Sequence, residues 1–339
     1  MRDMRLVLLL VPAFLAASPA RADPRPLGVF EQTLGRFDRD TLQPVGPALE
    51  LGEAHTGPVL EHGARRFAIG VSSPGLEGVP ETGAGRVGLW VVDAAVITVQ
   101  RQIRTGIAAE AVVFPGKVAA VLQDGALVVV DPDDGRILSR RDVGYSDSIP
   151  HGVEAGGRGV LVNEIHRGRS VEVAVVAASG RVRTATIPLP GVGRKVGLTS
   201  DGRRAYIAGN HRIAVLDPAT LHVTTRRFDG SASSAAFADG RLALAGPGGL
   251  RLYDAGSWRP LARDRTSDTV FAAGRAIIAG GAGHVSARTL AGRRLWRASG
   301  NVQAVAAGRV YTRREILDAK TGARVGTHPE NYTSISLIG

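Results

Sequence analysis

The chain has 339 residues, of which 44% are hydrophobic and 22% charged, so it is neither a disordered chain nor a bundle of membrane helices. It has no cysteine, which excludes disulfide scaffolds, cysteine-ligated zinc, covalently attached haem and a lipidated cysteine. The formal net charge is +11, but the basic residues are scattered and never form a run of five. We therefore do not expect a nucleic-acid or other polyanion site.

The first 22 residues have the pattern of a secretory signal peptide. Arg2 and Arg5 precede an apolar stretch of about a dozen residues, and small residues then lead to Ala20-Arg21-Ala22. This apolar core is shorter than the ~20 residues that a helix needs to cross a bilayer. We therefore expect cleavage after Ala22 and a periplasmic or secreted protein with no membrane span. Retention of the segment as an anchor stays open.

The rest of the chain repeats one pattern, in which an apolar strand, a polar turn and a second strand follow one another. Asp at the first turn position can cap backbone amides, Pro presets the next φ, and a late Gly accepts a positive φ. From Asp38 to Asp318 there are seven intervals with a mean of 40 residues. The eight turns begin at Asp38, Asp93, Asp131, Ala177, Asp217, Asp254, Leu290 and Asp318.

Between successive turns there is room for two further strands. The stretch from Lys195 to Phe228 shows all four apolar segments of one repeat. Four short strands in about forty residues, with no helical period after the signal, are typical of a β-propeller blade. We therefore predict an all-β fold, a β-propeller, with residues 23–339 forming a single domain.

The two ends of the chain together make one more repeat. The segment from Leu27 to Val45 has the second, third and fourth strands of a blade, and Tyr332–Ile338 can supply the first. Strands from both ends would then share one blade and leave no open edge. This predicts eight four-stranded blades. Seven blades plus a hairpin is the alternative, because the last interval between turns is only 28 residues.

The repeats resemble those of extracytoplasmic propellers of the YVTN group and the wider PQQ-like quinoprotein superfamily. The resemblance is clearest in Leu198–Thr220, which has an Asp-Gly turn, an apolar strand and an Ile-x-Val-x-Asp-x-x-Thr segment. Pro150-His151-Gly-Val resembles the entry to a first strand, and Gly292–Trp296 resembles the tryptophan docking turn of quinoproteins. The tryptophan recurs in one repeat of eight, and the adjacent-cysteine disulfide of quinone-binding members is impossible here. The resemblance implies the propeller fold but no activity.

One group of polar residues could do chemistry at the channel mouth. It comprises His55, Asp147, His151, Glu164 and His166, with Glu154 and Asn163 nearby. First strands of blades line the central channel, so His151, and His55 in the turn before Val59, would lie at blade entries. A histidine–carboxylate group there could bind a ligand or transfer protons. The same residues could instead satisfy backbone turns.

The remaining aromatic and imidazole side chains have simpler interpretations. We expect Trp90 and Tyr206 to pack between blades. We expect the other histidines to be surface or turn residues: His62, His211, His222, His284 and His328.

The sequence contains no nucleophile motif, P-loop or zinc-protease motif. We therefore predict a non-catalytic, monomeric propeller without cofactor or metal that binds an unidentified protein or small ligand at one face. A channel-mouth enzyme is the alternative, namely a lactonase, a lyase or a quinone-type oxidoreductase.

Overall fold

The computed structural model describes residues 26–30, 33–50, 55–62, 66–72, 88–93, 96–103, 108–114, 117–122, 125–142, 151–165, 169–190, 196–327 and 335–338. These residues form 32 strands and no helix, so the predicted all-β class is confirmed. A search of the same residues for a helix that could span a membrane found none. The predicted signal peptide and the loop between Ser72 and Gly88 lie outside the described residues.

The described strands form eight antiparallel sheets of four strands each, which we number along the chain. Sheet 1 contains β32 (Ile335–Ile338), β1 (Leu27–Phe30), β2 (Thr33–Phe37) and β3 (Pro44–Glu50). Sheet 2 contains β4 (His55–His62), β5 (Arg66–Ser72), β6 (Gly88–Asp93) and β7 (Thr98–Ile103). Sheet 3 contains β8 (Ala108–Phe114), β9 (Lys117–Leu122), β10 (Ala126–Val130) and β11 (Ile137–Asp142). Sheet 4 contains β12 (His151–Ala155), β13 (Arg158–Ile165), β14 (Ser170–Val176) and β15 (Val182–Ile187).

The second half of the chain repeats the same order. Sheet 5 contains β16 (Gly197–Ser200), β17 (Ala205–Ala208), β18 (Asn210–Leu216) and β19 (Val223–Ser231). Sheet 6 contains β20 (Ser234–Ala238), β21 (Arg241–Ala245), β22 (Leu250–Asp254) and β23 (Pro260–Asp264). Sheet 7 contains β24 (Thr269–Ala273), β25 (Ala276–Gly281), β26 (His284–Thr289) and β27 (Arg294–Ser299). Sheet 8 contains β28 (Val302–Ala306), β29 (Arg309–Thr312), β30 (Glu315–Asp318) and β31 (Arg324–Thr327).

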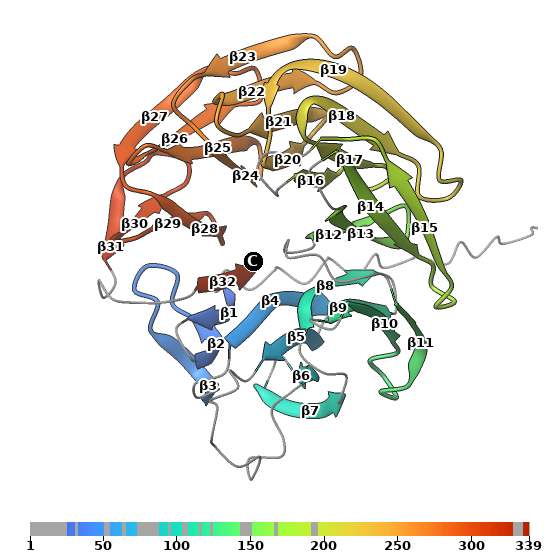
Figure 1. Ribbon diagram of the computed structural model, residues 1–339. Coiled ribbons are helices and arrows are strands. Elements are labelled where there is room, and N and C mark those ends of the chain that lie inside the picture. Colours follow the sequence, from blue (N-terminus) through green and yellow to red (C-terminus); the bar gives the residue numbers. More distant parts are fainter. Residues whose placement is uncertain are drawn as a thin grey trace, which may run out of the picture.

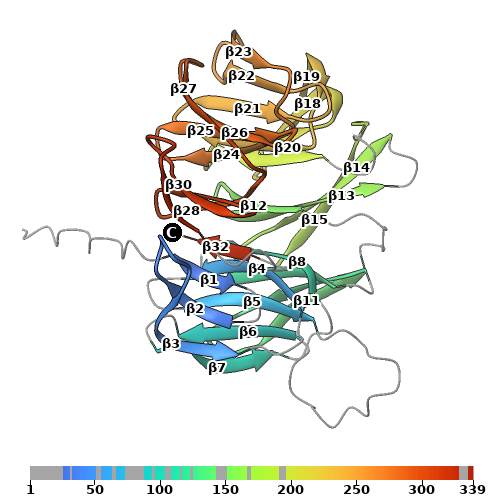
Figure 2. The ribbon, with the colours of Figure 1, turned by 90° about the vertical axis from the view of Figure 1, so that its left-hand side faces the viewer.

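The first strand of each sheet lies innermost, and the fourth lies at the rim (Figure 1). The first strands contact one another in the order β4, β8, β12, β16, β20, β24, β28 and β32, and β32 also contacts β4. Strand β32 pairs with β1 in register from Leu27 opposite Ile338 to Phe30 opposite Ile335, and Figure 2 shows the two side by side. The first and last described strands thus lie side by side in one sheet.

Glycine and serine let neighbouring first strands approach closely. A Cβ on Gly197 of β16 would lie 2.9 Å from the carbonyl carbon of Ser234, so no side chain fits there. The Ser234 hydroxyl accepts a hydrogen bond from the Val270 amide at 3.1 Å and donates one to the Val270 carbonyl at 3.3 Å. Small and hydroxylated residues on the inner strands therefore hold the centre of the fold together.

The core consists of layers between successive sheets. A sheet that packs between two neighbours is covered on both faces, so most residues of its middle strands are buried and apolar. All residues of β10 and β17 are buried. Fourth strands such as β11 have mostly exposed or half-buried residues. This explains why each repeat contains apolar runs followed by a more polar segment.

The turns between third and fourth strands confirm the predicted capping role of aspartate. The carboxylate of Asp131 accepts the Asp133 amide at 3.1 Å, and four equivalent contacts join Asp38 to Asp40, Asp217 to Ala219, Asp254 to Ser257 and Asp318 to Thr321. One predicted start was wrong by a residue. The Thr289 amide bonds the Arg293 carbonyl, so that turn begins at Thr289 and not at Leu290.

The late turn position adopts a positive φ, but glycine supplies it in only some repeats. Gly135 and Gly322 have φ of 72° and 73°. The same place is taken by Leu42, Ile97, Leu221 and Trp258, with φ between 51° and 63°. This conformation costs a non-glycine residue about 1–2 kcal/mol, which burial of a large apolar side chain can offset. Leu42 is 1% exposed and Ile97 4% exposed, as this compensation requires.

Candidate functional site

Three of the predicted site residues lie near strand termini on the same side of the fold. His55 and His151 are the first residues of β4 and β12, and Glu164 is next to last in β13. Sheets 2 and 4 each have four antiparallel strands in chain order, so their first strands start at the end where their second strands finish. His151 pairs with Val162, which places Glu164 two residues further toward that end. We call this the histidine end. Asp147 and His166 lie outside the described residues.

These positions belong to different sheets. Glu164 and His151 lie in sheet 4, whereas His55 lies in sheet 2. Strand β8 of sheet 3 lies between their first strands and contacts both. The fold therefore places His151 and Glu164 in the same sheet, and it places His55 two sheets away. In the described part of the chain, no group of three or more His, Cys, Asp or Glu could hold a metal ion.

The opposite end carries the aspartate turns, and we call it the turn end. A basic residue at the start of the second strand faces the turn aspartate across the sheet. Lys117 pairs with Asp131 at 2.7 Å, Arg241 with Asp254 at 2.6 Å, and Arg309 with Asp318 at 2.8 Å. The Lys117 ammonium holds the pKa of Asp131 below its usual value. Sequence reasoning missed these three cations, although each precedes its turn aspartate by 9 to 14 residues.

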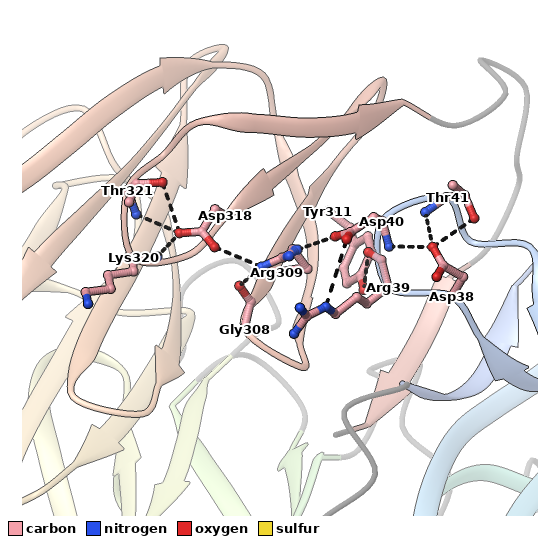
Figure 3. Close-up of polar contacts among 10 residues, drawn as sticks. All are labelled: Asp38, Arg39, Asp40, Thr41, Gly308, Arg309, Tyr311, Asp318, Lys320 and Thr321. Atoms are coloured by element: carbon pink, nitrogen blue, oxygen red, sulfur yellow. Dashed lines mark hydrogen bonds and ion pairs between the residues drawn. The ribbon is translucent and has the colours of Figure 1, made fainter.

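Arg309 of sheet 8 also contacts Asp40 in the turn of sheet 1, so it joins the two sheets (Figure 3). The Nε of Arg309 donates to Asp40 while its Nη1 donates to Asp318, and the arginine side chain is only 9% exposed. The Tyr311 hydroxyl donates to the Arg39 carbonyl at 3.1 Å. The Asp40 carboxylate raises the pKa of Arg309. This joint is satisfied internally, so it binds two sheets together and has no free acid for a ligand.

The aromatic residues pack as the sequence predicted where they are described. Tyr206 is 1% exposed and lies between sheets 5 and 6, against Phe237 and Trp258. Trp296 of sheet 7 donates from Nε1 to the Ala319 carbonyl of sheet 8 at 3.1 Å, and its ring covers Gly322. It thus docks one sheet on the next. The Trp90 side chain lies outside the described residues.

One histidine contradicts its predicted surface position. His284 begins β26 but is only 6% exposed, and its Nε2 lies 3.1 Å from the Thr266 hydroxyl. It lies in the layer between sheets 6 and 7, near the Arg288–Asp264 ion pair at 2.6 Å. The prediction failed because the sequence shows the strand end but not the preceding sheet that covers it.

Comparison with known proteins supports the fold but assigns no family. The sequence matches no family model and no curated protein. The crystal structure of BamB from Moraxella catarrhalis is similar with a TM-score of 0.56 and 15% identity, over 84% of this chain and 90% of that one. Apo AztD from Citrobacter koseri is similar with a TM-score of 0.61 and 12% identity, over 93% and 96%. Both are β-propellers, so the likeness shows the propeller fold.

Proposed function

We propose that this chain is an extracytoplasmic, non-catalytic β-propeller that binds a protein or a small ligand at its histidine end. The observation that carries the proposal is the chemical difference between the two ends. At the turn end, the carboxylates of Asp131, Asp254 and Asp318 are already paired with cations and backbone amides. The histidine end has the starts of β4 and β12, where His55 and His151 stand.

The scaffold in this proposal is a closed ring of eight blades formed by residues 23–339 after removal of residues 1–22. The continuous contacts among first strands and the pairing of β32 with β1 support closure. A closed ring has no free sheet edge at the channel and holds its end loops in fixed positions. Loops held by a rigid scaffold are suited to recognition. Mass spectrometry of the exported protein tests the cleavage after Ala22.

The binding group in this proposal is His55, Asp147, His151, Glu164 and His166. Imidazole and carboxylate together offer both donors and acceptors near neutral pH, which suits a polar ligand or a polar surface of a partner. The same chemistry could serve catalysis, so a metal titration is the discriminating control. Divalent metal that binds the full chain, and no longer binds His151→Ala, would favour the channel-mouth enzyme.

The test of the binding face is site-specific photocrosslinking in the producing cell. Benzoylphenylalanine replaces Arg169, which is exposed between β13 and β14 at the histidine end, or Lys320, which is exposed at the turn end. We expect a discrete crosslinked product from position 169 and none from position 320, with native mass spectrometry covering small ligands. A product from position 320 alone, or no product and no bound ligand, would overturn the proposal.

A further inference from the structure

The layer between sheets 6 and 7 contains a row of buried polar atoms without protein partners. Among the described residues, four buried side-chain atoms lack a partner, and three belong to β26. They are Nδ1 of His284, Oγ of Ser286 and Nε of Arg288. Alternate residues of a strand share one face. Val285 and Ala287 pack toward sheet 8, so the polar row faces sheet 6.

The ends of this row are connected through sheet 6. The Arg288 Nη2 donates to Asp264 Oδ2 at 2.6 Å, and the Thr266 hydroxyl donates to Asp264 Oδ1 at 2.8 Å. His284 Nε2 lies 3.1 Å from the same Thr266 oxygen. Contacts from His284 through Thr266 and Asp264 to Arg288 therefore link the two ends of the row, and Ser286 between them is 1% exposed.

The row offers both donors and acceptors. The Thr266 hydroxyl donates to Asp264, so the Thr266 oxygen is left to accept from His284 Nε2. Arg288 Nε is a donor, the Ser286 hydroxyl can donate or accept, and His284 Nδ1 accepts when the ring carries one proton. A ligand that both donates and accepts can therefore bond to all three atoms.

The charges beside the row favour a neutral ligand. The Arg288 cation is paired with the Asp264 carboxylate at 2.6 Å. A small ligand that donates and accepts, such as water, therefore fits the row better than an anion does. A single imidazole nitrogen is too few ligands for a metal ion. A buried polar atom without a partner lowers stability, so a ligand that supplies the missing partner is favoured.

We propose that ordered water binds between His284, Ser286 and Arg288 and is a structural part of the joint between sheets 6 and 7. Alternate Cα atoms of a strand lie about 6.7 Å apart, and the three polar atoms do not bond to one another directly, so bridging water is the simplest way to connect them. A buried water needs two to four polar partners, and these three side chains provide them.

The test is a crystal structure of the full chain at about 1.5 Å resolution, with a second crystal soaked in bromide. We expect water density within hydrogen-bond distance of His284 Nδ1 and of Ser286 Oγ or Arg288 Nε, and no anomalous bromide signal. The absence of water at these three atoms, or bromide bound there, would overturn the proposal.

Two substitutions give an independent readout. Ser286→Ala removes one partner and keeps the space, whereas Ser286→Val fills the space and strands the other two atoms. We expect the thermal midpoint of Ser286→Val to fall below that of Ser286→Ala by about 3 °C or more. Ala287→Val, on the apolar face of the same strand, controls for added bulk. A Ser286→Val protein as stable as the native chain would show that the space is dry.

Discussion

The two faces of sheet 6 are joined to their neighbours by different chemistry. Toward sheet 5, Tyr206 stacks on Phe237 with ring centroids 5.5 Å apart, and Tyr253 and Trp258 extend the same layer. Toward sheet 7, the apolar residues are alanines and aliphatics, and the polar row of β26 lies among them. We call these layers the aromatic joint and the polar joint.

The difference shows that one repeated fold does not require one repeated interaction. Apolar burial in the aromatic joint depends little on pH, and its Arg226 guanidinium lies over the Trp258 ring at 5.1 Å. The polar joint depends on the ionisation of Asp264, which pairs with Arg288. The two joints should therefore respond differently to truncation, to acid and to added bulk.

The largest effect is expected from Tyr206→Ala in the aromatic joint. It removes a fully buried ring and should lower the free energy of unfolding by about 3–5 kcal/mol, measured by urea denaturation. Tyr206→Phe loses only the hydroxyl that donates to Asp201 at 2.9 Å, which costs about 1–2 kcal/mol. Equal losses in the two variants would mean that the hydroxyl, and not the ring, holds this joint.

The next largest effect concerns Asp264 in the polar joint. Burial alone would raise its pKa, but hydrogen bonds from Thr266 and Arg288 lower the pKa of Asp264 to about 2. Because this value lies below the ordinary 3.8, the stabilisation is complete above pH 5 and is lost as pH falls toward 2. Asp264→Asn should cost about 2–3 kcal/mol at pH 7, since it leaves Arg288 without its counterion.

Acid titration of that variant distinguishes the two joints. The stability difference between the native chain and Asp264→Asn should shrink from pH 7 to pH 3, whereas the difference for Tyr206→Ala should change much less. A constant difference for Asp264→Asn would contradict the assigned ion pair.

A third prediction compares two glycines that share a φ of +73°. A Cβ on Gly322 would lie 2.5 Å from the Trp296 ring, whereas one on Gly308 would meet nothing within 4 Å. Gly308→Ala should cost about 1–2 kcal/mol from backbone strain alone. Gly322→Ala should cost about 1–3 kcal/mol more and change the Trp296 fluorescence. Similar losses of stability in the two variants would show that the Trp296 ring can shift to accommodate the added methyl group.

The smallest effect is expected at the joint between sheets 8 and 1. The Asp40 side chain is 39% exposed, so Asp40→Asn should lower stability by about 1 kcal/mol or less and lose that effect in high salt. Asp134→Asn is the control, because its pair with Arg136 stays within one exposed turn. A large loss of stability that does not depend on salt would show that this ion pair is as strong as the buried pair in the polar joint.

The fold could be predicted from the turn pattern because aspartate capping is local. Asp131 and Asp318 fix their turns through amides two or three residues away, so the sequence alone shows them. The positive φ of Leu42 and Trp258 could not be predicted, since it depends on a neighbouring sheet to bury the side chain. The rule that a late glycine marks the turn therefore misses several repeats.

The site was predictable only as far as strand direction determines it. His151 and Glu164 reach the same end because β12 and β13 are antiparallel. His284 was misplaced because a histidine at a strand end usually faces solvent. Here Asp264, in the preceding sheet, neutralises Arg288 and allows the row to be buried. A contact between two sheets joins residues far apart in the chain, so no local sequence pattern indicates it.

The pairing of Leu27 with Ile338 sets an order of events during folding. Sheets 2 to 8 are each continuous in the chain, so each can form as soon as its own residues are available. Sheet 1 combines β1 with the distant β32, and contacts between such distant residues form slowly. Until β32 has paired, β1 has an unpaired edge that can bind another chain. A protein truncated before β32 should therefore aggregate through β1, so the pairing of these two strands also protects the protein from aggregation.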